Sequence, residues 1–177
     1  RSLYSSKIKR TSYGGDERIM LNINLLTVNE SYDSNNTIEN TINYIFRLDN
    51  SLHFIYGVFP PDKDEIINLY EYLRSYLPQN TCSQQVQHLI FSIKDSDAEH
   101  VDLLLQFSNQ VAILISSLYP TCFALHDNTD NPHTHFIVST TSHHPDTSPF
   151  IGSVFKDFLR QIYLLASNMN IKLMEVK

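Results

Sequence analysis

The sequence has few cysteines and no long hydrophobic run. Its two cysteines, Cys82 and Cys122, lie far apart and form no Cys-x-x-Cys pair. This usage excludes a disulfide framework and a zinc knuckle, and it fits a reducing compartment. The longest apolar run, at residues 111–118, is far shorter than the ~20 residues that span a bilayer. We therefore expect a cytoplasmic location and no membrane span.

Basic residues are also scarce: 13 Lys and Arg stand against 19 Asp and Glu, for a net charge of −6. This balance argues against broad nucleic-acid affinity, which needs cations against phosphates. Five of the 13 basic residues nevertheless fall in the first 18 positions, namely Arg1, Lys7, Lys9, Arg10 and Arg18. We expect a basic arm at residues 1–18, with Lys7, Lys9 and Arg10 as candidate DNA contacts. A solvated terminus without a ligand is the alternative.

The rest of the chain, residues 19–177, has the length and composition of one globular domain, with 42% hydrophobic and 18% charged residues. The chain begins with Arg1 and not with Met, as expected of a trimmed chain or a fragment. Hydrophobic periodicity and helix-stop signals predict the following elements. Strands are expected at 18–28, 52–59, 86–93 and 171–176, helices at 37–48, 63–77, about 95–118 and 153–168, and a hairpin within 122–139. This order predicts an α/β or α+β sandwich, with helices packed on a mostly antiparallel sheet of about five strands.

The predicted hairpin carries three histidines. His133 and His135 are two residues apart, so both side chains project from the same face of their strand. His126 ends the preceding strand and would lie beside them if the two strands pair. Three imidazoles on one face form a divalent-metal constellation with an open position. Isolated surface or core histidines are the alternative, and Asp127 and Asp130 between the strands could simply favour the turn.

A three-histidine metal site polarises a phosphate or generates hydroxide. The nucleophile is then either water or a tyrosine. Among ten tyrosines, Tyr44 is distinguished by its place at the edge of the apolar stripe of the helix predicted at 37–48, from which its hydroxyl could reach the surface. Tyr163 is the rival, although its apolar context favours packing.

Together these motifs resemble those of the mobilisation relaxases, single-strand DNA nickases that start conjugative transfer, within the His-hydrophobic-His endonuclease superfamily. The segment from Leu125 to Val138 resembles their metal motif. Asn43-Tyr44-Ile45 with Arg47 resembles the tyrosine motif, Tyr56-Gly57-Val58 resembles the segment after it, and His88-Leu89-Ile90-Phe91-Ser92 resembles the strand whose serine contacts DNA. The resemblance covers roughly residues 19–176, in the family's order.

The resemblance implies that a divalent ion, Mg²⁺ or Mn²⁺, sits on His126, His133 and His135 and polarises the scissile phosphate. Tyr44 would attack in line, leaving a 5′-phosphotyrosyl strand and a free 3′-hydroxyl, and the reverse reaction would rejoin the strand.

Further roles are implied for residues near this centre. Asp127 or Asp130 would orient a histidine or help deprotonate the tyrosine, and Ser92 and Arg47 would contact DNA. The implied partners are single-stranded DNA at an origin of transfer, relaxosome accessory proteins and a type IV secretion coupling protein, in plasmid or integrative-element mobilisation.

The sequence also departs from the family pattern. Thr134 lies between the histidines where a hydrophobic residue is expected, Asn131 replaces a further histidine, and Ser139 replaces an asparagine. These departures and the acidic body leave open a DNA-binding or relaxosome interaction module with a degenerate metal site. A rolling-circle replication initiator or transposase-type nickase that uses Tyr163, and an unrelated metal-dependent phosphoesterase, are further alternatives.

Overall fold

The computed structural model describes residues 21–28, 32–47, 52–56, 62–77, 81–94, 100–127 and 131–176, with the backbone alone described for 52–56. Several sequence predictions fall outside these residues, namely the basic arm at 1–18 with Lys7, Lys9 and Arg10, the turn residue Asp130, and Gly57 and Val58. The domain boundary at residue 19 therefore stays a prediction.

Within the described residues, six strands and four helices follow one another, and every predicted strand and helix has its counterpart. They are β1 (Leu21–Thr27), α1 (Thr37–Ile45), β2 (Leu52–Tyr56), α2 (Lys63–Tyr76), β3 (Val86–Ser92), α3 (Val101–Ser116), β4 (Thr121–His126), β5 (His133–Ser139), α4 (Gly152–Asn168) and β6 (Ile171–Val176). None of these helices combines the length and the apolarity that a membrane span requires.

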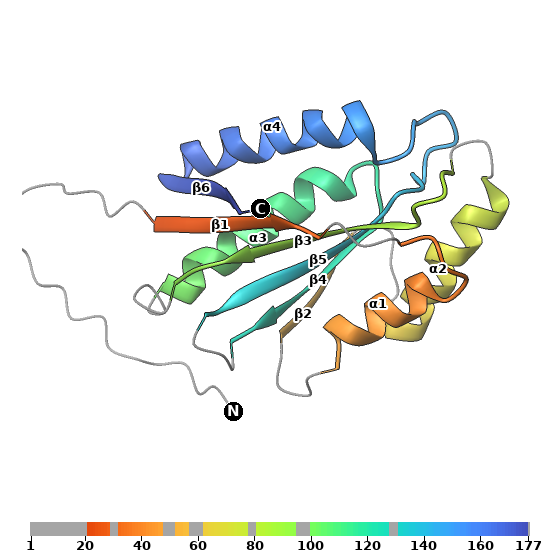
Figure 1. The fold of residues 1–177 in the computed structure, drawn as a ribbon, viewed down its shortest axis with the longest axis horizontal. Helices are drawn as coiled ribbons and strands as arrows, with labels where there is room; N and C mark the ends of the chain where they lie inside the picture. The colour runs from red at the N-terminus through yellow and green to blue at the C-terminus, as the bar shows by residue number, and fades with distance from the viewer. Residues whose placement is uncertain are drawn as a thin grey trace, which may run out of the picture.

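The strands form one sheet in the order β2-β4-β5-β3-β1-β6. All neighbours are antiparallel except β1 and β6, which pair in parallel at one edge. The predicted α+β fold with a mostly antiparallel sheet is confirmed, with six strands where about five were expected (Figure 1). The predicted hairpin strands, β4 and β5, lie side by side in the interior of the sheet.

Each face of the sheet has its own helices and its own core. Helices α3 and α4 cover one face, and α1 and α2 cover part of the other (Figure 1). Three side chains of β1 belong to the first core, namely Leu21, Ile23 and Leu25. The β1 residues between them are half-buried. The second core joins the stripe Ile38, Ile42 and Ile45 of α1 to α2 and to Ile137 of β5. Because strand side chains alternate, His133 and His135 share the face of Ile137, under α1.

Local signals explain where the two helices on this face begin and end. The apolar residues of α1 recur at i, i+4 and i+7, which places them on one side of the helix. Asp62 caps α2, since its carboxylate accepts a hydrogen bond from the Asp64 N–H at 2.7 Å. Helix α2 ends at Tyr76, just before Pro78 in the sequence, a residue that cannot continue a helix.

The polar residue between the two β5 histidines has a partner in the opposite core. Thr134 is fully buried, and its hydroxyl lies 2.9 Å from the hydroxyl of Ser108 on α3. A buried hydroxyl is costly only when it lacks a hydrogen bond. Thr134 is therefore accommodated by the helix that packs over it, and it leaves the histidine face unchanged.

This pair gives a stability prediction. Ser108→Ala leaves the Thr134 hydroxyl without its partner and is expected to lower the free energy of unfolding by about 1–3 kcal/mol. The double variant Ser108→Ala/Thr134→Val replaces both hydroxyls with apolar groups and should regain most of that loss. Urea unfolding of the two variants and the wild type measures the difference. Equal destabilisation by the single and the double variant would contradict the pairing.

Candidate metal and nucleophile site

Three histidines converge where β4 ends and β5 begins. The antiparallel register pairs His126 with His133 directly, and His135 lies one row further along β5. The ring centroid of His135 lies 4.7 Å from that of His126 and 4.8 Å from that of His133. The centroids of His126 and His133 are 5.3 Å apart. One ligand nitrogen from each ring lies within 4.8 Å of the others. This cluster, the histidine triad, is thus able to hold one metal ion.

Backbone carbonyls orient two of these rings. Nε2 of His126 donates to the carbonyl of Ile45 at 2.9 Å, and Nδ1 of His133 donates to the carbonyl of Asn131 at 2.8 Å. A carbonyl only accepts, so each of these nitrogens carries the proton, and a neutral ring keeps its lone pair on the other nitrogen. The lone pairs available to an ion are therefore on Nδ1 of His126 and Nε2 of His133.

The contact of His126 also attaches helix α1 to the site. Ile45 is the last residue of α1, and the last four carbonyls of a helix lack partners inside it. The imidazole of His126 satisfies one of these carbonyls. Because Tyr44 precedes Ile45 directly, the same contact holds the candidate nucleophile beside the histidine triad.

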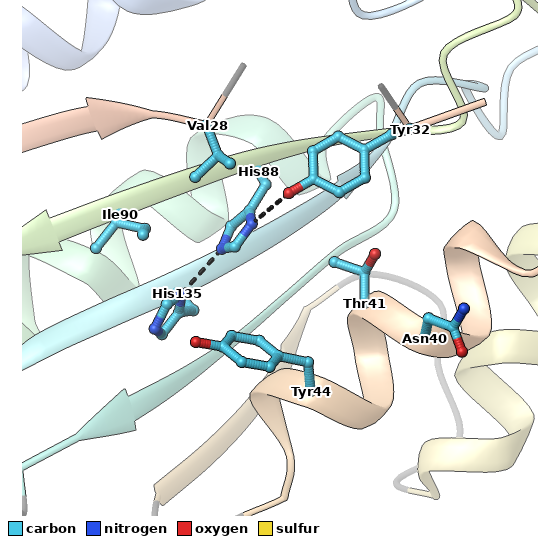
Figure 2. Close-up of a pocket in the computed structure, with 8 residues that line it drawn as sticks. All are labelled: Val28, Tyr32, Asn40, Thr41, Tyr44, His88, Ile90 and His135. Carbon is cyan, nitrogen blue, oxygen red and sulfur yellow. Dashed lines mark hydrogen bonds between the residues drawn. The ribbon is translucent and has the colours of Figure 1, made fainter. Parts of the chain in front are cut away.

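The third ring, His135, is the first member of a series of hydrogen-bonded side chains that line a neighbouring cavity. Its Nδ1 lies 2.9 Å from Nε2 of His88 on β3, and Nδ1 of His88 lies 2.8 Å from the hydroxyl of Tyr32 (Figure 2). All three side chains are buried. They line a cavity of about 390 Å³, whose other lining residues are Val28, Asn40, Thr41, Tyr44 and Ile90.

Burial keeps several of these imidazoles neutral. Desolvation lowers the pKa of His135 to about 2 and the pKa of His88 to about 4, and it also lowers the pKa of His133. The positive charge of Arg47, and repulsion from neighbouring imidazoles whenever these are protonated, depress the pKa of His135 further. Metal ions bind the neutral imidazole, so these rings are in the metal-binding form at neutral pH.

Tyr44 lies beside His135 of the histidine triad, and its side chain reaches the surface, as its position on the helix edge predicted. The side chain is 42% exposed, and its ring meets the ring of His135 edge to face with centroids 5.6 Å apart. Figure 2 shows the ring pointing from α1 toward His135. The guanidinium carbon of Arg47 lies 4.3 Å from the Tyr44 ring centroid, within the range of a cation–π contact. Tyr44 and Arg47 thus lie on the same face of the sheet as the triad.

The other predicted site residues lie at different distances from this centre. Ser92 pairs with His133 across β3 and β5, so it shares a row of the sheet with the triad. Asp127 follows His126 with an exposed side chain, and in the described part of the chain no hydrogen bond or ion pair joins it to a histidine. Asp130 lies outside the described residues. The ring-orienting groups that the structure describes are carbonyls and His88.

Tyr163 belongs to α4 on the opposite face of the sheet. That helix packs on α3 and β6 as part of the first core, whereas the triad faces α1. Its side chain is 38% exposed, so it is not the packed residue that its apolar context predicted. Burial and Glu175 raise the pKa of this phenol. The geometry therefore gives Tyr163 no route to the histidines.

Sequence reasoning missed the contacts of His88 and Tyr32. His88 entered only as part of the motif that ends in Ser92, although strand alternation puts His88, Ile90 and Ser92 on one face. What periodicity does not supply is that β3 pairs with β5. Tyr32 precedes α1 in an irregular segment, where no pattern indicates a contact with a strand more than 50 residues away.

The fold and the histidine triad define an α+β domain with a candidate metal site, and the comparison with protein families identifies its class. Residues 52–157, more than half of the chain, match the family model of the MobA/VirD2-like relaxase nuclease domain. The chain therefore belongs to this relaxase family. No curated protein and no solved structure matches it significantly. The match contains all three histidines and begins after Tyr44, so it does not test Tyr44 as the nucleophile.

Proposed function

We propose that this domain nicks and rejoins single-stranded DNA at an origin of transfer through a covalent tyrosyl–DNA intermediate. The observation that carries the proposal is the position of Tyr44, whose ring touches His135 of the histidine triad while its side chain remains open to solvent. A buried tyrosine, or one on the other face, would not meet a DNA phosphate there.

The donor set fits a divalent ion. His126 and His133 each have one ring nitrogen hydrogen-bonded to a carbonyl and the other available, and the ligand atoms of all three rings are close enough to share one ion. Neutral imidazoles suit first-row transition ions better than Mg²⁺, so of Mg²⁺ and Mn²⁺ we favour Mn²⁺. When bound, the ion would polarise a non-bridging oxygen of the scissile phosphate.

The residues of the chain supply the rest of the reaction. The Tyr44 oxygen forms a bond to phosphorus as the bond to the 3′-oxygen breaks, and the leaving 3′-oxygen takes a proton from water to become a hydroxyl. The 5′ phosphate of the downstream strand stays on the tyrosine, ready for the reverse reaction. Arg47, against the Tyr44 ring, carries a charge that attracts the phosphate. Asp127 and Asp130 are proposed to take the tyrosine proton or to orient a histidine.

Substrate binding extends from this centre. Ser92, in the row of His133, is proposed to contact a DNA phosphate, and the basic arm with Lys7, Lys9 and Arg10 to hold the strand. The wider setting of the proposal is the cytoplasm and mobilisation of a plasmid or integrative element. Relaxosome accessory proteins and a type IV secretion coupling protein are the proposed partners there.

This function can be tested by comparing DNA that is labelled at its 3′ end with DNA that is labelled at its 5′ end. The tyrosine would retain the 3′ part of the cut strand, so a randomised single-stranded library labelled at its 3′ end should become covalently attached to the protein in Mn²⁺. The same library labelled at its 5′ end should yield only free fragments. Chelation with EDTA removes the ion and should reduce both products to background. Denaturing electrophoresis separates the adduct, and sequencing of captured strands identifies the site.

Two outcomes would contradict this account. Transfer of the 5′ label would mean that the covalent bond has the opposite polarity. A folded protein that binds Mn²⁺ and single strands but captures no label would favour the interaction module with a degenerate site.

A further inference from the structure

The third ligand of the histidine triad differs from the other two in how its tautomer is fixed. The carbonyls of Ile45 and Asn131 force a proton onto one nitrogen of His126 and of His133. Nδ1 of His135 instead faces Nε2 of His88 at 2.9 Å, and an imidazole nitrogen either donates or accepts. The hydrogen-bonding state of His88 therefore decides whether His135 offers a lone pair to an ion.

Two proton arrangements satisfy this chain of contacts. In the first, Nδ1–H of His135 donates to His88, and Nδ1–H of His88 donates to the Tyr32 oxygen, which leaves a lone pair on Nε2 of His135. In the second, every donor is reversed: Tyr32 donates to His88, His88 donates to His135, and Nε2 of His135 carries a hydrogen. A ring with that hydrogen is closed to a metal.

We propose that His88 and Tyr32 are positioning residues, which hold His135 in the first arrangement so that its Nε2 completes the metal site with His126 and His133. This inference rests on the metal-dependent function proposed above. It assigns a role to two residues that do not contact the reacting atoms. Neither belongs to the histidine triad, and they come from β3 and from the segment before α1.

The burial of the pair supports such a role. His88 is 5% exposed and Tyr32 is 8% exposed, and burying polar groups is costly unless they are hydrogen-bonded. The ring of His88 uses both nitrogens, one on each neighbour. A simple core position would be filled more cheaply by an apolar side chain. The contact with a triad member gives a physical reason for an imidazole at this position.

His88, the hydrogen-bond partner of His135, is an imidazole, and this choice of partner affects the charge that a bound ion would keep. Ligand histidines often donate to a carboxylate, which raises the basicity of the ring. For His88 and His135, in the part of the chain that the structure describes, the partners are an imidazole and a phenol and not a carboxylate. A bound ion would keep more of its positive charge with three neutral ligands and neutral hydrogen-bond partners for His135, and it would polarise a phosphate oxygen more strongly.

Substitutions at residue 88 separate positioning from packing. His88→Leu keeps a buried side chain but removes the acceptor for Nδ1–H of His135. His88→Gln places an amide oxygen close to the former Nε2 and restores an acceptor. Loss of a group that orients a metal ligand typically weakens metal binding by about 10- to 100-fold. We expect His88→Leu to weaken Mn²⁺ binding by this factor, Tyr32→Phe to weaken it less, and His88→Gln to stay close to the wild type.

The experiment has one arm that needs no metal and one that does. In the metal-free wild type, long-range ¹H–¹⁵N NMR should show His135 protonated at Nδ1 and not at Nε2. Observation of the Nε2–H form would overturn the inference, whatever the activity. In the second arm, calorimetry measures Mn²⁺ affinity, and thermal unfolding verifies that each variant is folded.

The outcomes distinguish this inference from the proposed function. If the wild type binds no Mn²⁺, the metal-dependent function is wrong. The NMR result alone would then test the tautomer of His135. If the wild type binds Mn²⁺ and folded His88→Leu binds it equally tightly, the positioning role is wrong. Failure of His88→Gln to restore affinity, with a folded protein, would also contradict it. If His88→Leu does not fold, the NMR arm and His88→Gln still test the role.

Discussion

Tyr44→Phe is expected to abolish the covalent capture of 3′-labelled DNA and to lower strand cleavage by on the order of 10⁶-fold, as removal of a nucleophile does in other enzymes. The oxygen that would bond to phosphorus is lost. The phenyl ring keeps its edge contact with His135 and its place under Arg47. Mn²⁺ affinity and thermal stability should therefore match the wild type. Cleavage kinetics and calorimetry on the same preparation measure both quantities.

Tyr163→Phe is the matched control, because it removes a partly exposed phenol from α4 on the other face of the sheet. It should leave capture and cleavage unchanged. Cleavage by Tyr44→Phe at the wild-type rate would mean that the nucleophile is wrongly assigned. Loss of capture in Tyr163→Phe alone would favour the rolling-circle or transposase type of nickase.

Removal of a triad histidine should have the second large effect. His133→Ala takes away one of three ligands and is expected to weaken Mn²⁺ binding by more than the roughly 100-fold upper range for groups that only orient a ligand. Cleavage should fall to background at micromolar Mn²⁺. Since His133 is half-buried whereas His126 and His135 are buried, His133→Ala should leave the smallest cavity and fold best.

His144→Ala provides the control for this substitution. His144 is an exposed histidine in the segment between β5 and α4, away from the triad. Its removal should change neither Mn²⁺ affinity nor cleavage. If His133→Ala and His144→Ala bind Mn²⁺ as tightly as the wild type, the histidine triad does not hold the ion.

The histidine triad could be predicted because its three residues lie close together in the sequence. His133 and His135 share a face because strand side chains alternate, and His126 joins them because a short connection forces β4 and β5 to pair. Periodicity and a hairpin therefore suffice to predict the cluster. The exposure of Tyr44 follows in the same way from its position beside the apolar stripe of α1.

The parts that escaped prediction depend on pairings between distant segments. The register that brings His88 of β3 against His135 of β5 cannot be predicted from the hydrophobic periodicity of either strand. The same holds for the parallel pairing of β6 with β1, because the predicted strand at 171–176 carries no signal that identifies its neighbour in the sheet. Thr134 looked like a departure from a family pattern, and only the packing of α3 supplies its partner, Ser108.

The most direct test is a crystal soaked in Mn²⁺ and examined by anomalous scattering. The account predicts one strong peak bounded by Nδ1 of His126, Nε2 of His133 and Nε2 of His135, with the Tyr44 ring beside it. Ordered histidines with no peak between them at millimolar Mn²⁺, or a peak on other ligands, would contradict the account.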